Sequence, residues 1–411
     1  MRRLAAATTA VALAILTGCG PRAAKAPAAA DAIVFRTTSP AEALAPLLAE
    51  FESANPGLHV RLEIVDCPPD ADTLLAARAG GPRPDLCEVP DGPLPRLVAT
   101  GRLSDWSAGV ADLRDSLRGW PACMVGESIY ALPWRLDAVT LCWNPQLFAR
   151  ARLDAHHAPR TWDEVRQAAV RLAALHGGVH ALGLSVDDST GTCDDFLPWA
   201  WSRGGGVCAG PHDSVCVGGD ENVAALEFLA ALPGAVRLAS RETLQAEFAH
   251  GTLGMLLADG DSWGAIARLP GAGRFAAAPV PAWVADSSQG VTLGRVVALA
   301  SPSDARHREG ALRLARFLSS AHCQYALAST SWPMLPSLAG CRGRVDAGRD
   351  GTASLRAAVL ARARFAQPTA QWNDIRRAIG AAVEDALRGR AEPGAALATA
   401  DSEVVALMGH R

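Results

Sequence analysis

Lysine and tyrosine are nearly absent from this chain of 411 residues, which has one lysine, Lys25, and two tyrosines, Tyr130 and Tyr325. Lys25 lies in an Ala/Pro-rich stretch near the N-terminus. The folded part of the chain can therefore hold no Schiff-base lysine and no lysine-dependent phosphate site. Iron sites built from paired tyrosines are also disfavoured, because only two tyrosines exist.

Long apolar segments and basic clusters are missing beyond the N-terminus. No later segment is long and apolar enough to span a membrane as a helix. Lys and Arg total 39 against 42 Asp and Glu, and no basic patch interleaved with aromatics is visible, which argues against a nucleic-acid partner. Residues 80–82 lack the lysine of a phosphate loop, and residues 183–187 lack the last glycine of a nucleophile elbow. We therefore expect no catalysis and no cofactor.

Residues 1–19 have the features of a lipoprotein signal peptide. Two arginines precede the apolar segment 4–16, which is too short for a stable transmembrane helix. The segment ends in Leu-Thr-Gly-Cys at 16–19, which resembles the lipobox of bacterial lipoproteins, whose cysteine takes the lipid. We expect lipidation at Cys19, anchoring to a membrane outside the cytoplasm, and a flexible tether at 20–31.

Nine further cysteines can form disulfides outside the cytoplasm, and their odd number leaves at least one unpaired. The best candidate pair, Cys208 and Cys216, brackets a Gly/Pro loop. With a histidine between them these two could be metal ligands, but the spacing matches no standard zinc pattern, so we expect no metal site. Weaker candidate pairs are Cys123 with Cys142 and Cys67 with Cys87.

Strand and helix patterns alternate along the chain. A strand is expected at 32–38, then a helix with Ser39 as N-cap and apolar residues at helical spacing, then an alternating strand at 58–65. This β-α-β unit predicts a sheet that begins parallel. Acidic pairs at 187–188 and 194–195 could bind a cation or act as acid and base, but we assign them to a solvated loop. Further helices are expected at 162–176 with Thr161 as N-cap, 222–232 and 312–327, and further strands at 85–89, 182–185, 255–257 and 296–299.

The stretch 128–148 organises the chain. Two short apolar runs, 129–132 and 138–143, have the β-branched and aromatic content of buried strands. Between them, Trp134, Arg135 and Asp137 combine an aromatic ring with two charges. Such a group indicates either a structural ion pair or a cleft, and a cleft fits the rest of the chain.

Motifs spread over nearly the whole chain occur in a recognisable order. They are 50–60 (EFESANPGLHV), 84–86 (PDL), 99–105 (ATGRLSD), the stretch 128–148, 161–164 (TWDE), 199–205 (WAWSRGG), 248–255 (FAHGTLGM), 292–300 (TLGRVVALA), and 372–387 with 395–397. Together they resemble family 1 extracellular solute-binding proteins, the maltose-binding-protein-like carbohydrate-binding components of ABC importers. Gly254 stands where the family usually has alanine.

The resemblance implies an α/β, two-lobed periplasmic-binding-protein fold of type II, with lobes joined by three hinge crossings and ligand held between them. The N-terminal lobe would comprise residues 32–136 and 295–338. The C-terminal lobe would comprise residues 137–294 and 339–411. Pro133 to Asp137 would then form the first crossing.

Sugar binding uses aromatic faces for the ring and charged groups for the hydroxyls. Glu88 and Asp91 end the third predicted strand, where ligands of α/β sheets gather. Each tryptophan could instead pack in a core, and each charge could form a structural ion pair; Trp106, Trp120 and Trp162 are assigned to packing. The resemblance carries Trp372 and Trp263 over as ligand-binding residues by motif. The full expected set is Trp372, Asp91, Trp263, Arg135, Asp137, Trp134, Glu88, Trp199 and Trp201.

We therefore expect a monomeric, lipid-anchored, extracytoplasmic protein that passes a di- or oligosaccharide to an ABC permease by hinge closure. Within the same fold, a glycerol phosphodiester or a polyamine is an alternative solute. A sensor subunit that feeds a receptor is a second alternative. An extracytoplasmic hydrolase with an Asp/Glu pair is the third.

Overall fold

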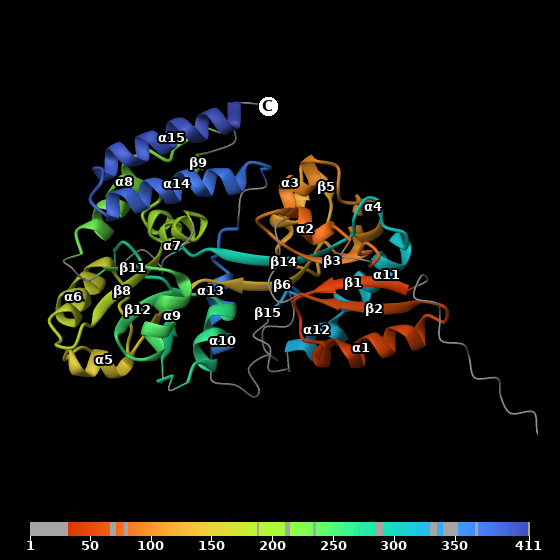
Figure 1. Cartoon of the computed structure of the whole chain (residues 1–411), viewed down its shortest axis with the longest axis horizontal. Helices are drawn as coiled ribbons and strands as arrows, with labels where there is room; N and C mark the ends of the chain where they lie inside the picture. Colours follow the sequence, from red (N-terminus) through yellow and green to blue (C-terminus); the bar gives the residue numbers. More distant parts are fainter. Residues whose placement is uncertain are drawn as a thin grey trace, which may run out of the picture.

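The computed structural model describes residues 32–65, 71–77, 81–186, 189–209, 214–232, 236–270, 272–273, 275–284, 291–328, 335–339, 352–365 and 369–409. These residues form two lobes, each built on a mixed β-sheet flanked by helices (Figure 1). The predicted α/β class is confirmed. The predictions for Cys19, the tether, Cys67 and the acidic pair at 187–188 lie outside the described residues.

The first lobe holds a six-stranded sheet in the order β15-β6-β14-β3-β1-β2. β1 runs parallel to β2 and β3, whereas β14 runs antiparallel to β3 and β6. The strands are β1 (Ala32–Thr37), β2 (His59–Ile64), β3 (Leu86–Pro90), β6 (Leu132–Ala138), β14 (Gly294–Ala300) and β15 (Leu335–Pro336). The helices of this lobe are α1 (Ala41–Ala54), α2 (Ala71–Leu75), α3 (Leu94–Ala99), α4 (Ser107–Val110), α11 (Arg308–Leu318) and α12 (Ala321–Ala328).

The second lobe holds a five-stranded sheet in the order β11-β8-β12-β7-β13. β8 runs parallel to β11 and β12, and β7 runs antiparallel to β12 and β13. The strands are β7 (Thr140–Trp143), β8 (His180–Ser185), β11 (Val236–Ala239), β12 (Leu253–Ala258) and β13 (Ala276–Ala278). The helices are α5 (Pro145–Arg150), α6 (Trp162–Ala173), α7 (Ser189–Ser202), α8 (Asp220–Ala230), α9 (Arg241–Ala249) and α10 (Gly260–Arg268), with α14 (Trp372–Leu387) and α15 (Pro393–Gly409) packed on α7 and α8.

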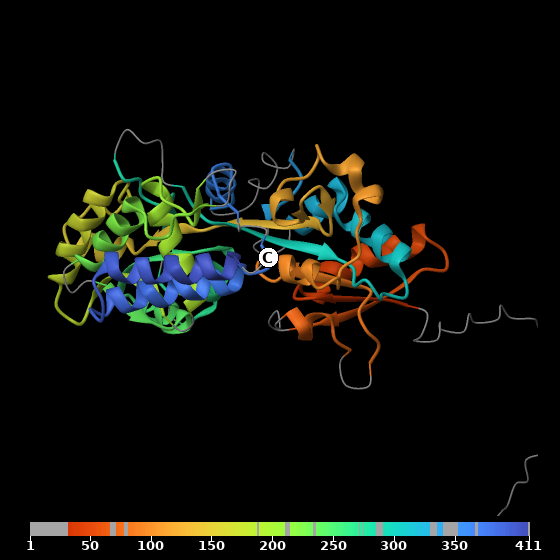
Figure 2. The ribbon, with the colours of Figure 1, turned by 90° about the horizontal axis from the view of Figure 1, so that it is seen from above.

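The chain passes from the first sheet to the second within the stretch 128–148. The second predicted strand is present as β7, but the first is displaced, because β6 begins at Leu132 and includes Pro133 to Asp137, which were expected to lie between the strands. β6 belongs to the six-stranded sheet and β7 to the five-stranded sheet, and only Val139 separates them. The N–H of Val139 donates to the carbonyl of Leu293 at 3.0 Å, just before β14 begins. β6 and β14 therefore run side by side between the lobes (Figure 2). Helix α13 (Thr352–Leu360) packs on β6, β13 and β15 at the same junction.

Local sequence accounts for the elements that precede this crossing. α1 buries Leu44, Leu47, Leu48 and Phe51, the residues whose spacing predicted it, and β1 and β2 pair in parallel register as expected. Thr161 caps α6 as predicted, because its hydroxyl accepts from the N–H of Glu164 at 3.2 Å.

Two local predictions are wrong. Ser39 is not the N-cap of α1: Pro40 holds that position, and the Ser39 hydroxyl instead donates to the carboxylate of Glu88. The helix expected at 312–327 is two helices, because α11 ends with Ser319 as its C-cap and α12 starts at Ala321.

The predicted bridge between Cys208 and Cys216 is not formed. The ribbon of β9 (Cys208–Ala209) and β10 (Ser214–Val215) pairs Cys208 with Val215, and Cys216 follows as a free thiol. The register that pairs Cys208 with Val215 leaves Cys216 one residue beyond that pair, so the two cysteines are not opposite each other. Cys123 and Cys142 are also free, in the cores of different lobes, and Cys87 is free.

Candidate functional site

Three groups of buried charged side chains lie at the junction of the lobes. The first surrounds Glu88 on β3, which is 3% exposed. Its carboxylate accepts from the hydroxyls of Thr37 and Ser39 and from the N–H and hydroxyl of Thr38 at 3.3 and 2.8 Å. Arg135 on β6 adds an ion pair at 3.2 Å. Two predicted site residues, Glu88 and Arg135, are thus brought together where β1 and β3 end.

The second group surrounds Asp137, the last residue but one of β6. Its carboxylate accepts from the N–H of Gly260 at 2.6 Å and lies 3.5 Å from the Nε of Arg356 on α13. Gly260 begins α10, and a Cβ there would lie 2.5 Å from Asp137 Oδ2 and 2.1 Å from an Arg356 nitrogen, so any larger residue would displace one of these two side chains. Burial and the nearby negative charge of Asp259 raise the pKa of Asp137 to about 6, although the positive charge of Arg356 opposes the rise.

Asp137→Asn tests this burial through the pH dependence of stability. The folded carboxyl titrates near 6 and the unfolded one near 3.8, so at intermediate pH the folded state binds more protons. This carboxyl group stabilises the folded state fully at a pH below the pKa of the unfolded chain. That stabilisation is lost as the pH rises through the pKa of the folded protein. Relative to Asp137→Asn, the wild type should lose up to about 3 kcal/mol of unfolding free energy between about pH 4 and 7. Urea unfolding of both proteins measures this, and a difference that stays constant with pH would contradict it.

The third group surrounds Asp194 on α7. Its carboxylate accepts two hydrogen bonds from Arg376 on α14, one from Nε at 2.9 Å and one from an NH2 group. It accepts a third from an NH2 group of Arg295 on β14 at 2.5 Å. Burial opposes ionisation of Asp194, but the two guanidinium groups outweigh it and hold the pKa below its ordinary value. The prediction of a solvated loop at 194–195 is therefore wrong. Asp195 is buried too, and it accepts from Arg241 on α9 and from the N–H of Ser185.

Asp91 lies between these groups at the end of β3 and is 7% exposed. Its backbone N–H donates to Val296, and its carboxylate accepts from the N–H of Val296 at 3.3 Å. Burial raises the pKa of Asp91, although Arg295 and Arg376 oppose the rise. In the described chain no ion pair within 4.0 Å joins Asp91 to either arginine.

The five predicted tryptophans lie in the lobe cores. Trp134 contacts Phe35 and donates its indole N–H to Leu318 at 3.2 Å, inside the first lobe. Packing covers both faces of these rings. None of the five therefore presents an exposed face on which a sugar could stack. Their exposed fractions are 0% for Trp134, 0% for Trp199, 6% for Trp201, 7% for Trp263 and 2% for Trp372. Trp106, Trp120 and Trp162 are buried as predicted.

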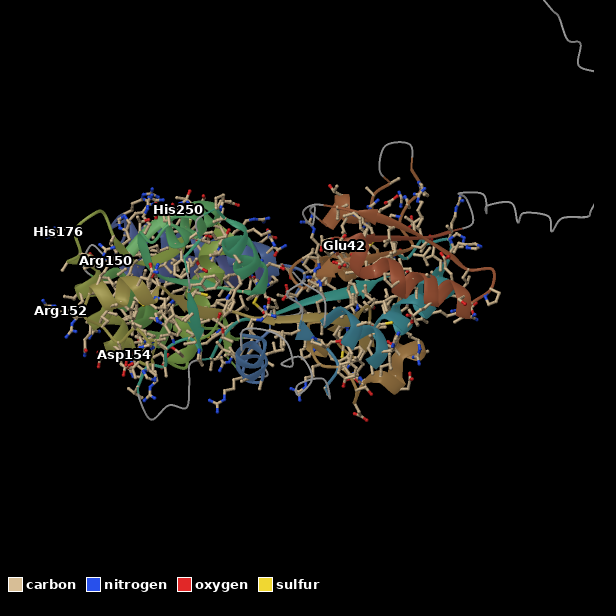
Figure 3. The ribbon with its side chains drawn as sticks, turned by 90° about the horizontal axis from the view of Figure 1, so that it is seen from below. Glu42, Arg150, Arg152, Asp154, His176 and His250 are labelled. Carbon is tan, nitrogen blue, oxygen red and sulfur yellow. The ribbon has the colours of Figure 1, made fainter. Side chains whose placement is uncertain are left out.

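The sequence reasoning missed Arg295, Arg356, Arg376 and Asp194. Arg295 follows the Thr-Leu-Gly motif at 292–294, and this position in the return crossing is the one local signal that could have found it. Five other titratable residues lie away from the junction, exposed on the outside of the second lobe: Arg150, Arg152, Asp154, His176 and His250 (Figure 3). Glu42 is exposed in the first turn of α1, three residues after Ser39.

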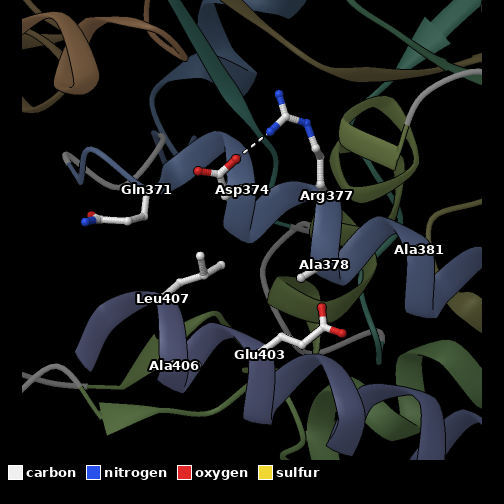
Figure 4. A pocket seen from close by; sticks show the side chains of 8 residues that line it. All are labelled: Gln371, Asp374, Arg377, Ala378, Ala381, Glu403, Ala406 and Leu407. Carbon is white, nitrogen blue, oxygen red and sulfur yellow. Dashed lines mark hydrogen bonds and ion pairs between the residues drawn. The ribbon is translucent and has the colours of Figure 1, made fainter. Parts of the chain in front are cut away.

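A groove of about 830 Å³ lies between α14 and α15 (Figure 4). Apolar side chains including Leu407 line it, and Asp374, Arg377 and Glu403 stand at its edge. Within the described ranges, no group of three or more His, Cys, Asp or Glu residues could hold a metal ion. Among the helices described, none combines the length and apolar character needed to cross a membrane.

The family model described as bacterial extracellular solute-binding protein matches residues 37–322. Among curated protein sequences, none matches the chain. Solved structures with the same fold cover more than nine tenths of this chain. Their sequence identities are low, so the likeness shows the fold alone.

Three of these structures illustrate the likeness. An ABC transporter solute-binding protein from Thermotoga lettingae, bound with alpha-D-tagatose, is 21% identical with a TM-score of 0.77 over 91% of this chain and 98% of its own. The GacH receptor of Streptomyces glaucescens, solved unliganded and with acarbose, is 20% identical with a TM-score of 0.78 over 92% and 98%. UgpB from Mycobacterium tuberculosis, in complex with glycerophosphocholine, is 19% identical with a TM-score of 0.77 over 92% and 98%. The type II two-lobed fold predicted from the motifs is confirmed.

Proposed function

Because the chain belongs to the bacterial extracellular solute-binding protein family of ABC transporters, we propose that it binds a sugar between its lobes and delivers it to an ABC permease. The observation that carries this proposal is the convergence of charged groups from both lobes at their junction. Glu88 and Asp91 come from the first lobe, and Asp194 and Arg376 come from the second. Charged donors and acceptors of this kind form strong hydrogen bonds with hydroxyl groups.

The mechanism is a hinge. A solute that contacts both lobes favours the closed arrangement by the difference between its affinities for the closed and open forms. The closed form then docks on the permease. The proposed lobes are residues 32–136 with 295–338 and residues 137–294 with 339–411, and the lipid on Cys19 would hold the monomer outside the cytoplasm.

The proposed solute contacts are the polar members of the predicted set, Glu88, Asp91, Arg135 and Asp137. Glu88 and Asp137 lie at strand ends beside the junction, where a closing second lobe would cover them. A di- or oligosaccharide is favoured because relatives of the same fold were solved with acarbose and with maltose. A glycerol phosphodiester is the second candidate, since UgpB holds glycerophosphocholine.

A thermal-shift screen of the mature protein tests the solute class. A sugar that binds the folded state should stabilise it by about 2.7 kcal/mol at a hundredfold excess over Kd. The panel contains mono-, di- and oligosaccharides, with glycerophosphocholine and spermidine as non-sugar probes. If glycerophosphocholine or spermidine raises the melting temperature and no sugar does, the proposed solute class is wrong.

A further inference from the structure

Arg295 has hydrogen-bond donors that the protein leaves unused. Within the described chain, Asp194 is the one group that accepts from its guanidinium, and it takes NH2 alone. The side chain is 30% exposed although it stands at the junction of two lobes. A guanidinium carries five N–H donors, so several of those on Arg295 remain available to a bound molecule.

Asp194 fixes the direction of those donors. Its carboxylate is 6% exposed and lies between Arg295 and Arg376, which approach it from different elements. The contact with Arg376 is bidentate, through Nε and NH2. Such paired contacts restrict the rotation of both partners. Asp194 therefore holds one guanidinium from the crossing strand β14 and one from α14 in a single orientation.

Asp91 faces this arrangement without contacting it. Its charge acts on Arg295 and Arg376, yet no ion pair within 4.0 Å is formed with either in the part of the chain that the structure describes. The neighbouring Gly92 lies so close to α14 that a Cβ would be 3.2 Å from Asn373 Oδ1 and 3.5 Å from Arg376 NH1. The two lobes thus meet beside Gly92. There the Asp91 carboxylate, an acceptor, and the Arg295 guanidinium, a donor, do not contact each other.

We propose that a hydroxyl group of the solute joins Asp91 to Arg295, and that Asp194 is the positioning residue for this contact. The inference rests on the proposed function and specifies its chemistry. A hydroxyl donates one hydrogen bond and accepts others, so it can donate to the Asp91 carboxylate while accepting from Arg295. Two aspartates balance the charges of the two arginines, so the group has no excess positive charge for an anionic solute, and a hydroxyl group carries no charge.

The alternative solutes fit this arrangement less well. A phosphodiester brings a negative charge to a site whose two positive charges are already matched by Asp91 and Asp194, and Asp259 adds a further negative charge near Arg295. An ammonium group of a polyamine has donors and no acceptor, so it leaves the Arg295 donors unmatched.

The experiment measures the affinity of the mature full-length variants for a sugar from the panel above that binds the wild type. Arg295→Gln and Asp194→Asn should each reduce the affinity for that sugar by about tenfold or more, since each disturbs a charged hydrogen bond. Arg295→Lys keeps the charge and one donor and should recover part of the loss. Because Arg295 is partly exposed, Arg295→Gln decides the question even if Asp194→Asn does not fold.

Asp195→Asn is the matched control. Asp195 follows Asp194 on α7, is equally buried, and also pairs with an arginine, but its partners are Arg241 and Ser185. Asp195→Asn should lower the melting temperature of the free protein as Asp194→Asn does, yet change sugar affinity by less than about twofold. Unchanged sugar affinity in Arg295→Gln overturns this inference and leaves the proposed function standing. Binding of glycerophosphocholine or spermidine in place of every sugar overturns the solute class itself.

Discussion

Replacing Glu88 by alanine should lower the free energy of unfolding by about 3–5 kcal/mol, the cost of removing one partner from a buried ion pair. Arg135 would keep its charge at 10% exposure without the carboxylate that lies 3.2 Å away. The hydroxyls of Thr37 and Ser39 would lose their acceptor in the same step. Sugar affinity should fall as well, because Arg135 would lose its fixed orientation. Glu88→Gln keeps an acceptor oxygen and should lose less stability.

Urea unfolding followed by tryptophan fluorescence measures this change. Glu42→Ala is the control in the same lobe, since Glu42 lies exposed in the first turn of α1. Glu42→Ala should cost no more than about 1 kcal/mol, the contribution of a charge at a helix terminus. If Glu88→Ala is as stable as Glu42→Ala, the buried carboxylate does not hold this region together.

Replacing Trp134 by alanine should cost about 3–5 kcal/mol of unfolding free energy, as expected for a large buried side chain. Its ring meets Phe35 edge-on with centroids 6.1 Å apart. Removing its indole N–H also takes away the donor to the Leu318 carbonyl. Because the ring is 0% exposed, sugar affinity of the folded fraction should not change. A sugar-stacking residue would behave in the opposite way, losing affinity with little loss of stability.

Trp283→Ala provides the comparison with an exposed ring. Trp283 is 38% exposed and lies under the guanidinium of Arg203, 3.9 Å from the ring centroid. The ring also meets Trp162 edge-on with centroids 4.8 Å apart, so its removal should cost about 1–2 kcal/mol, the sum of a cation–π and an aromatic contact. Calorimetric titration with the bound sugar measures affinity, and urea unfolding measures stability, for both variants. A tenfold loss of affinity in Trp134→Ala with near-normal stability would restore the stacking role.

Much of the fold could be predicted because its signals are local or ordered along the chain. The burial of Leu44, Leu47, Leu48 and Phe51 follows from their spacing in α1. The parallel pairing of β1 with β2 follows from the β-α-β pattern. The break between α11 and α12 was missed because apolar residues continue on both sides of Ser319 and Ser320, and neither proline nor glycine marks the break.

The candidate site was less predictable than the fold. The location of Glu88, Arg135 and Asp137 at the junction could be predicted because charged residues at the ends of buried strands are unusual, and their contact with a solute stays a prediction. The partners of the third group could not be predicted, because Asp194 meets Arg295 after 101 residues and Arg376 after 182. Along the sequence, Arg376 resembles any surface charge of an amphipathic helix. The burial of the tryptophans could not be predicted for a related reason, since composition gives their number and tertiary packing decides which faces remain open.

The place of β14 in the first sheet also bears on how the protein is made. β14 lies between β6 and β3, but it is synthesised roughly 160 residues after β6. At about 5–20 residues per second, the emerging first lobe waits for about 8–30 s without its middle strand. During that interval β3 and β6 have no strand between them to pair with. The first sheet can therefore be completed only after every strand of the second sheet, β7 to β13, has been synthesised.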